Sequence, residues 1–461
     1  MKILFVTDNF PPEVNAPATR TLEHARAWVA AGHQVTVITC APNFPHGRVF
    51  PGYRNRLCQT EDMDGIQVVR VWSYMTANAG FAKRVLDYLS FAFSAFFAGL
   101  FRRADVIVAT SPQFFTTFTG CALSVLKRRP WVFELRDLWP ESIAAVGAMK
   151  AGRAVRLLER IELFMYRHAA AVVALTPAFK RNLVARGIDP AKIAVVTNGV
   201  DRQSFPPRPR NDTVRRDLGL GDGFVIGYIG TMGMAHGLEF AVRAFARIDR
   251  PDLRLLLVGD GAARDAVARL AAELAPERIV VHPPVPKDRV AEMIAACDAA
   301  LVPLKKSDTF KTVIPSKMFE LGSMGKPILL GVEGQAREIV EAYDAGVCFE
   351  PENTLSFTAA VTTLADDPDR RARHAAGAER LADAYSRPRL AAHMADVLAA
   401  VAARRPLPAP EARPEAKPAA RPEAKPAARP EAKPAATPGP RADTAAQEDA
   451  RPAPARADET L

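Results

Sequence analysis

The sequence has few features of a disulfide framework or of a structural metal site. Its 461 residues include five cysteines, and none stands in a CxxC pair or beside a histidine at metal-ligand spacing. Scattered thiols of this kind are typical of reduced, packed cysteines in a cytosolic protein. The five are Cys40, Cys58, Cys121, Cys297 and Cys348.

Long apolar runs are also missing. The N-terminus, MKILFVTDNF, has too short a run for a signal peptide and leads straight into a predicted strand. The hydrophobic segment 85–101 contains an uncharged run from Tyr88 to Phe101, which is 14 residues against the roughly 20 that a membrane-spanning helix needs. We therefore expect a cytoplasmic protein in which this segment does not span a membrane.

Segment 85–101 leaves two interpretations open. A buried helix packed on a sheet would explain its phenylalanines. An interfacial helix would also explain the basic pairs at its two ends, Lys83–Arg84 and Arg102–Arg103, because such pairs meet lipid phosphates while an aromatic face enters the bilayer. The second interpretation predicts a peripheral protein at the inner face of the cytoplasmic membrane.

The net charge is +10, and the hydrophobic content of 49% is enough for two domains of ordinary size. A positive body favours acidic partners such as nucleotide diphosphates, an anionic membrane or nucleic acid. Nucleic acid is the weakest of these candidates, because the C-terminal tail alternates its charges and has no aromatic residues for base stacking.

Short β-rich runs alternate with helical stretches, which predicts parallel sheets covered on both faces. One series begins at KILFVTD and another at FVIGYIG, so the expected fold class is α/β with two Rossmann-like, doubly wound domains facing a cleft. The tail repeats RPEAKPAA three times, an octad without a large apolar residue that should be disordered. The predicted divisions are a first domain at 1–197, a linker at 198–222, a second domain at 223–385, a helix at 386–403 that packs back on the first domain, and the tail at 404–461.

Ligands of doubly wound folds bind at the carboxyl ends of the strands. The first strand runs into the long loop TDNFPPEVNAPATR, in which Asn15 and Ala16 are small enough to admit a ligand phosphate or sugar. Glu13 and Arg20 of the same stretch are candidates for the acceptor side. An ordinary surface loop is the alternative.

The stretch FELRDLWPES at 133–142 is a second candidate region of the first domain. Its strand ends at Leu135, and Arg136, Asp137 and Glu141 follow at the crevice end of the sheet. A catalytic or substrate-orienting carboxylate belongs at such a position, and Asp137 is our candidate for it.

The second domain opens with FVIGYIGTMGMAHGLEF, a strand followed by a glycine-rich turn. Gly230 and Gly233 can expose backbone N–H groups to a diphosphate, and Thr231 and His236 belong to the same turn.

Two other motifs resemble ligand sites but are better explained as turns. GDGAARD at 259–265 has Arg264 in place of the third glycine of a dinucleotide fingerprint. Asp62–Met63–Asp64 has the DxD form of metal-dependent sugar transferases, but Gly65 and a strand follow at once, which favours a turn over a metal site.

The stretch TVIPSKMFELGSMGKP at 312–327 follows the strand AALVPL, so its helix should start at the crevice. We expect Ser316 to cap that helix, Lys317 to place a cation beside the free N–H groups, and Glu320 to lie on the same helix face. Amides and a lysine suit a diphosphate, and a carboxylate suits a ribose diol. The alternative is a capped helix with a surface glutamate.

With these motifs in order, the sequence resembles the family 4 glycosyltransferases, retaining enzymes of the GT-B fold that use nucleotide-sugar donors. The similarity runs from Met1 to about Val401. It is carried by TNGVD at 197–201, the GDG turn, PSKMFELGSMGKP, EPENTLSFTAAVTTLADDPDRR and YSRPRL, and it looks nearest to a subgroup that builds O-antigen and capsule units, including fucosamine transferases.

Residue by residue, the resemblance implies that Glu320 is the second glutamate of an E-x7-E element that holds the donor ribose, while Thr312 replaces the first. The Arg and Lys that hold the diphosphate in the family fall on Thr231 and His236, and the family's paired glycines fall on Asn15–Ala16. A histidine near the transferred sugar is replaced by the Arg136–Asp137 neighbourhood. We interpret these departures as a subgroup solution in which Lys317 neutralises the diphosphate and Asp137 replaces the histidine.

The implied activity is retaining transfer of a hexosyl or N-acetylhexosaminyl group from a nucleotide sugar, with UDP favoured, to a polyprenyl diphosphate-linked or glycan acceptor. No cofactor and no metal are expected, because the lysine and the helix end can stabilise the leaving group. Two alternatives remain, namely a nucleotide-sugar 2-epimerase and a non-catalytic protein that binds a membrane surface.

Overall fold

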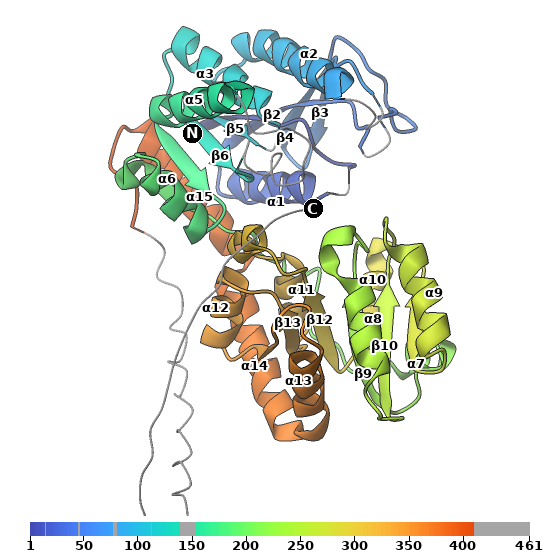
Figure 1. The fold of residues 1–461 in the computed structure, drawn as a ribbon. Coiled ribbons are helices and arrows are strands. Elements are labelled where there is room, and N and C mark those ends of the chain that lie inside the picture. The colour runs from blue at the N-terminus through green and yellow to red at the C-terminus, as the bar shows by residue number, and fades with distance from the viewer. Residues whose placement is uncertain (14, 45–46, 77–80, 112, 139–152, 410–461) are drawn as a thin grey trace, which may run out of the picture. The chain divides into compact units, whose positions relative to one another are not determined.

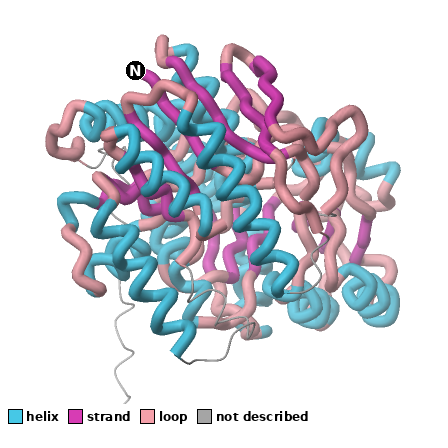
Figure 2. The backbone as a smooth tube through the Cα atoms, turned by 90° about the horizontal axis from the view of Figure 1, so that it is seen from above, coloured by secondary structure: helices cyan, strands magenta, loops and turns pink. Residues whose placement is uncertain are grey.

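The computed structural model describes residues 1–13, 15–44, 47–76, 81–111, 113–138 and 153–409, without the side chains of residues 81, 82 and 153–155. The predicted tail lies outside these ranges from residue 410 onward. Helices alternate with strands along both halves of the described chain. Helices and loops surround the strands in the view from above (Figure 2).

An eight-stranded sheet organises the first half of the chain, in the order β3-β4-β2-β1-β5-β6-β7-β8. Its neighbouring strands are parallel except for the antiparallel hairpin of β3 with β4. The order reverses direction at β1, so β1 and β5 define a switch point where doubly wound folds bind ligands. The strands are β1 (Lys2–Val6), β2 (Gln34–Cys40), β3 (Cys58–Met63), β4 (Ile66–Val71), β5 (Val106–Thr110), β6 (Trp131–Leu135), β7 (Ala171–Ala174) and β8 (Ile193–Val195).

Helices cover both faces of this sheet, as the apolar strands require. One face packs against α2, α3, α5 and α6, and the other packs against α1 and α15. The helices are α1 (Ala16–Ala30), α2 (Phe81–Leu100), α3 (Phe115–Lys127), α5 (Arg153–His168), α6 (Pro177–Ala185) and α15 (Arg387–Ala402), with the 3₁₀ helix η1 (Pro190–Lys192) before β8.

A second sheet of six parallel strands follows, in the order β11-β10-β9-β12-β13-β14. Its switch point lies between β9 and β12. The strands are β9 (Phe224–Ile229), β10 (Leu253–Val258), β11 (Ile279–His282), β12 (Ala299–Pro303), β13 (Ile328–Gly331) and β14 (Gly346–Cys348). The helices are α7 (Asp212–Asp217), α8 (Leu238–Ala246), α9 (Arg264–Leu274), α10 (Val290–Ala295), α11 (Lys317–Ser323), α12 (Gln335–Ala342), α13 (Thr354–Asp366) and α14 (Pro368–Ala384), with 3₁₀ turns η2 (Met234–His236), η3 (Lys287–Arg289) and η4 (Asp308–Thr312). Two parallel, doubly wound sheets are the fold class that the alternating pattern predicted.

The last helix, α15, belongs to the first sheet although it follows the second in sequence (Figure 1). Trp28 of α1 donates its indole N–H to the carbonyl oxygen of Ala391 at 2.8 Å. The chain crosses back where Val200 pairs with Ser386, and Arg387 donates to the carbonyl of Gly199 at 2.8 Å. The motifs TNGVD and YSRPRL, which are far apart in sequence, therefore lie side by side.

Part of the predicted linker at 198–222 is folded. Helix α7 lies inside it, and its Arg215 is buried with hydrogen bonds to the carbonyls of Ala296 and Gly223 and an ion pair to Asp298 at 2.6 Å. Composition alone missed this piece because six helical residues among prolines and charges give no periodic signal.

Helix α2 combines features of both interpretations of segment 85–101. Phe91 and Ala95 are buried in the core of the first sheet, whereas Phe93 is 67% exposed. No helix in the described part of the chain combines the length and hydrophobicity that crossing a membrane requires.

Candidate functional site

The switch point of the second sheet holds the most distinctive polar arrangement in that sheet. The glycine-rich turn leaves β9 at Gly230, whose φ of 144° is open only to glycine. Helix α11 begins at Lys317, beyond β12. A Cβ atom built on Gly230 would lie 2.9 Å from the Lys317 Nζ, so the missing side chain leaves room for the lysine.

Lys317 is a cation without a hydrogen-bonding partner among the described residues. Its Nζ is buried, forms no hydrogen bond with any described group, and lies 3.8 Å from the centroid of the Tyr228 ring. Burial lowers the pKa of the amine to about 8, although the Glu320 carboxylate opposes this shift. A buried, unpaired ammonium is costly to the fold and is characteristic of a site that an anion completes.

Two neighbours of Lys317, Tyr228 and His236, carry no compensating charge. Tyr228 donates its hydroxyl to the carbonyl of Thr231, and burial raises the pKa of that hydroxyl. His236 accepts the Gly233 N–H at its Nδ1 at 3.2 Å, and its pKa is lowered by burial and by the Lys317 charge. His236 is therefore neutral near pH 7 and holds the turn without adding to its charge.

The predicted cap at Ser316 is wrong. Ser316 has helical dihedral angles, φ −60° and ψ −29°, and its side chain makes no capping hydrogen bond. Helix α11 is also only 7 residues long, so its dipole contributes less than the sequence suggested. The lysine itself supplies the charge at this position.

Glu320 lies one turn along α11 from Lys317 and is partly buried. Burial raises the pKa of its carboxyl, and the charges of Lys317 and Lys287 oppose this effect. Lys287, in η3, is a basic neighbour that sequence inspection did not identify.

The carboxyl edge of the first sheet is rich in charges that satisfy one another. Arg20 is buried, donates from Nε to Glu134 Oε1 at 3.0 Å, and binds the carbonyls of Thr197 at 2.6 Å and Val196 at 3.1 Å. Arg20 therefore ties α1 to β6 and to the end of β8, a structural role in place of the acceptor contact expected from the sequence.

Arg136 is one of the described residues at this edge with unused hydrogen-bonding capacity. Its backbone N–H donates to Ser111 Oγ at 2.9 Å, but its Nη1 is buried without a described partner, as is Glu134 Oε2. Burial lowers the pKa of Arg136 to about 10, while the Glu134 and Asp8 carboxylates oppose the shift and the Arg20 charge adds to it. Asp137 follows in a partly buried position and interacts with neighbouring groups, and Glu141 lies outside the described residues.

Two loop residues predicted to face ligands are used by the fold. Asn15 is the N-cap of α1, where its Oδ1 accepts the Ala18 N–H at 2.9 Å and its Nδ2 donates to Asn9 at 2.7 Å. Glu13 is buried and accepts the backbone N–H groups of Asn43 and Phe44 at 2.8 Å each. Both side chains stabilise the loop after β1.

The remaining predicted residues, Lys83 and Arg84, are exposed in the first turn of α2. The DxD stretch is a turn, as predicted, with the Gly65 N–H donating to Asp62 Oδ1 at 3.1 Å. In the described residues, no group of three or more His, Cys, Asp and Glu side chains is placed to hold a metal ion.

Sequence inspection missed Tyr228, Asp8 and Glu134. Glu134 could have been found, because a glutamate inside the apolar strand WVFEL must have a buried partner. Tyr228 gave no such signal, since an aromatic residue is ordinary in a strand.

Comparisons with known proteins agree with this geometry. Residues 15–199 match the family described as "Glycosyl transferase 4-like domain", and residues 223–367 match "Glycosyl transferases group 1". The chain belongs to the group 1 glycosyltransferases and has the GT-B fold.

Individual relatives cover most of the chain. The putative colanic acid biosynthesis glycosyl transferase WcaI of Escherichia coli K12 is 24% identical over 373 residues, covering 78% of this chain and 91% of that protein. The probable glycosyltransferase WbjE of Pseudomonas aeruginosa is 27% identical over 53% of this chain and 62% of its own length. The crystal structure of Anabaena HepE in complex with UDP has a TM-score of 0.64 at 18% identity, covering 87% of this chain and all of the other.

Proposed function

We propose that this protein is a retaining glycosyltransferase that moves a sugar from a UDP-linked donor to a polyprenyl diphosphate-linked acceptor in the synthesis of a cell-surface polysaccharide, such as O-antigen, capsule or exopolysaccharide. Family membership supports sugar transfer, and the names of WcaI and HepE with UDP support the pathway class and the nucleotide. The fucosamine-transferase-like subgroup remains part of this proposal.

The observation that carries the proposal is the Lys317 amine, which is buried against the Gly230 turn and has no hydrogen-bond partner in the described part of the chain. A diphosphate that enters this turn would receive the ammonium. The backbone N–H groups of Gly230 and Gly233, which the sequence suggested for this role, already donate to the Val258 carbonyl and to His236 Nδ1. Glu320, on the same short helix, would accept hydrogen bonds from a ribose diol. The lysine and the glutamate would thus contact the diphosphate and the ribose of a nucleotide sugar.

The reaction itself needs little covalent help from the protein. The bond from the sugar C1 to the diphosphate oxygen breaks, the acceptor hydroxyl oxygen forms the new bond on the same face, and the hydroxyl proton passes to the departing phosphate oxygen. Negative charge grows on the diphosphate as the bond breaks, so a fixed ammonium stabilises the transition state more than the ground state. No metal is required for this charge compensation.

The first lobe would receive the acceptor. Arg136 offers a buried guanidinium with one unused nitrogen, and Asp137 follows it at the same strand end. An acceptor that carries a diphosphate would complete the hydrogen bonds of Arg136, and Asp137 would orient the incoming hydroxyl. Lys83 and Arg84, exposed on α2, would meet the inner surface of the cytoplasmic membrane.

Thermal unfolding with a panel of UDP- and GDP-sugars tests the donor site directly, because a ligand that binds only the folded state raises the unfolding temperature. We expect a UDP-sugar to protect the full chain, and the Lys317→Met variant to lose most of that protection. Lys326→Met is the matched control, since the Lys326 amine at the other end of the same segment already binds the Cys297 carbonyl at 2.7 Å.

Product analysis then identifies the reaction. Transfer to a lipid-linked acceptor with retained anomeric configuration supports the proposal. Conversion of the donor to an epimer without any acceptor would instead identify an isomerase, and equal protection of Lys317→Met and the wild type would contradict the donor site.

A further inference from the structure

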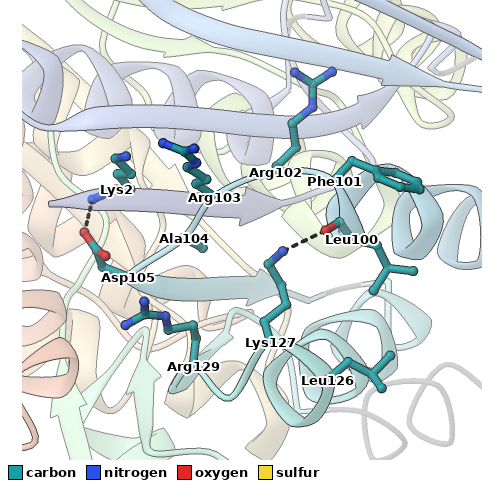
Figure 3. Close-up of a pocket in the computed structure, with 10 residues that line it drawn as sticks. All are labelled: Lys2, Leu100, Phe101, Arg102, Arg103, Ala104, Asp105, Leu126, Lys127 and Arg129. Atoms are coloured by element: carbon teal, nitrogen blue, oxygen red, sulfur yellow. Dashed lines mark hydrogen bonds between the residues drawn. The ribbon is translucent and has the colours of Figure 1, made fainter.

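The amino ends of strands β1, β5 and β6 carry a basic hollow at the edge of the first sheet opposite the candidate site. Its volume is about 580 Å³. Five cations border it against a single carboxylate, Asp105. The lining residues are Lys2, Leu100, Phe101, Arg102, Arg103, Ala104, Asp105, Leu126, Lys127 and Arg129 (Figure 3).

Some of these polar groups are engaged within the protein. The Lys2 backbone N–H donates to Asp105 at 2.7 Å, and Lys127 Nζ donates to the Leu100 carbonyl at 2.9 Å (Figure 3). Arg102 reaches Thr60 Oγ1 at 3.2 Å. These contacts hold the walls of the hollow in place.

Two guanidinium groups remain available. Arg103 and Arg129 are exposed, and neither side chain has a hydrogen bond or an ion pair with any group in the described part of the chain. Because Asp105 is already bonded to Lys2, the hollow has an excess of positive charge. Its complement is an anion with several oxygens, such as a phosphate.

The rim of the hollow is apolar and exposed. Phe101 is 85% exposed and Leu126 is 62% exposed, at the ends of α2 and α3. A free phosphate in water would gain nothing from these side chains. A phosphate attached to acyl chains would bury them.

The exposed apolar surface continues along α2. Leu86, Leu89, Phe93 and Phe97 are exposed and recur at intervals of three and four residues, so they form one stripe on the helix. The helix is about 30 Å long. Because α2 follows β4, it begins at the carboxyl edge of the sheet and ends at the basic hollow.

We infer that the α2 stripe and the basic hollow together form the face that rests on an anionic lipid bilayer, with a phospholipid headgroup phosphate held between Arg103 and Arg129. This inference rests on the proposed function, whose lipid-linked acceptor lies in a membrane. The inference also extends the proposed function, because it assigns the lipid contact to the edge of the first sheet that lies away from the candidate site. The bilayer then contacts the whole length of α2, and the sugar-bearing end of an acceptor can reach the carboxyl edge.

The charges of the stripe agree with this orientation. Asp87 is the one acidic residue in the sequence of α2, it is partly buried, and burial together with the Asp8 charge raises its pKa to about 7. Lys83 and Arg84 add two exposed cations at the start of the helix. Basic residues at a membrane surface contribute about 1 kcal/mol each, which is roughly a fivefold change in partitioning.

Vesicle co-sedimentation of the full chain without donor tests the inference. We expect binding to phosphatidylcholine vesicles that contain phosphatidylglycerol, weak binding to pure phosphatidylcholine, and loss of roughly 20-fold or more for Arg103→Glu/Arg129→Glu. Phe93→Ser/Phe97→Ser should weaken binding to both kinds of vesicle. Arg243→Glu/Arg247→Glu, which changes one exposed arginine of α8 and another at its C-cap, is the matched control and should bind like the wild type.

The readouts separate lipid binding from catalysis. Thermal protection by a UDP-sugar should be unchanged in Arg103→Glu/Arg129→Glu. If the proposed donor site is wrong, the protection assay will show it, and the vesicle assay can still be interpreted. Inorganic phosphate at constant ionic strength should not displace the protein from vesicles, and displacement would favour a free phosphate ligand over a lipid. Equal vesicle binding by the wild type and by Arg103→Glu/Arg129→Glu would overturn the inference.

Discussion

The carboxyl edges of the two sheets use charge in opposite ways. In the first sheet, the Arg20 guanidinium donates hydrogen bonds to Glu134 and to two backbone carbonyls, so its charge is largely compensated within the protein. In the second, Lys317 is buried beside an aromatic ring without a hydrogen-bond partner among the described residues. A cation at the carboxyl edge thus serves stability in one lobe and is available to a ligand in the other.

Breaking the Arg20 network should give the largest effect on stability. Arg20→Ala leaves the Glu134 carboxylate buried without its partner, and we expect the free energy of unfolding to fall by about 3–5 kcal/mol. Arg26→Ala on the same helix is the control, because its ion pair with Asp64 is half exposed and should contribute less than about 1 kcal/mol. Denaturant titration measures both. A similar small loss in the two variants would show that Arg20 is not a structural tie.

Removing Lys317 should separate activity from stability. Lys317→Met is expected to lose roughly 10²-fold or more in turnover, because charge on the leaving diphosphate is no longer compensated. Its free energy of unfolding should stay equal or rise, since an unpaired buried cation is replaced by an apolar chain of similar length. Glu320→Ala should lose a similar factor in turnover.

Lys326→Met should show the reverse pattern, with lower stability and turnover within a few-fold of the wild type. Its amine is held by the Cys297 carbonyl, and the substitution removes that bond. Turnover near the wild-type value in both Lys317→Met and Glu320→Ala would remove the assignment of the donor site to α11.

The pH dependence of donor binding follows from the lowered pKa of Lys317. The ammonium form binds the diphosphate, so the affinity for UDP should fall as pH rises above about 8, approaching tenfold per pH unit well above it. Calorimetric titration of the wild type against Lys317→Arg checks this, since the arginine stays charged and should flatten the profile. A wild-type profile that stays flat to about pH 10 would contradict a role for the Lys317 charge.

The same shift has a consequence for folding with the opposite sign. The folded protein releases the Lys317 proton near pH 8, whereas the unfolded chain keeps it up to its usual value of 10.5. The unfolded state therefore binds more protons in this window, and stability without ligand should rise from about pH 8 to 10.5 through this group. Lys317→Met should lack that component of the rise.

The smallest effect is expected for Asn15→Ala. Loss of the α1 cap should lower the free energy of unfolding by about 1 kcal/mol and leave the KM for the donor unchanged. Asn353→Ala removes the equivalent cap of α13, whose Oδ1 accepts the Ser356 N–H at 3.0 Å, and should cost a similar amount. A raised KM in Asn15→Ala alone would restore the donor contact that the sequence suggested.

The sequence predicted the architecture well because strand and helix periodicities are local signals. The alternation that starts at KILFVTD and FVIGYIG was enough to predict two doubly wound sheets, and position after strands β9 and β12 was enough to bring Gly230 and Lys317 together. The partners of individual charged residues were harder to predict from the sequence. Arg20 and Glu134 are separated by 114 positions, and nothing local distinguishes a paired arginine from an exposed one.

The helix caps at Asn15 and Ser316 were not predicted correctly. Asn15 was assigned to a ligand but caps α1, while Ser316 was assigned as a cap but makes no capping bond. The residue type permits a cap, but the backbone dihedral angles of the cap residue decide whether the capping hydrogen bond forms.

The return of α15 to the first sheet makes the second lobe an insertion within the first. The two crossing points, Val200 and Ser386, are paired, so the inserted segment begins and ends at neighbouring positions. A fragment that stops near residue 200 would expose the apolar face around Trp28 that α15 normally covers, and we expect such a fragment to aggregate. For expression and for domain exchange, the natural unit is the segment between Val200 and Ser386. We expect that a short linker can replace this segment while α15 stays packed on the first sheet.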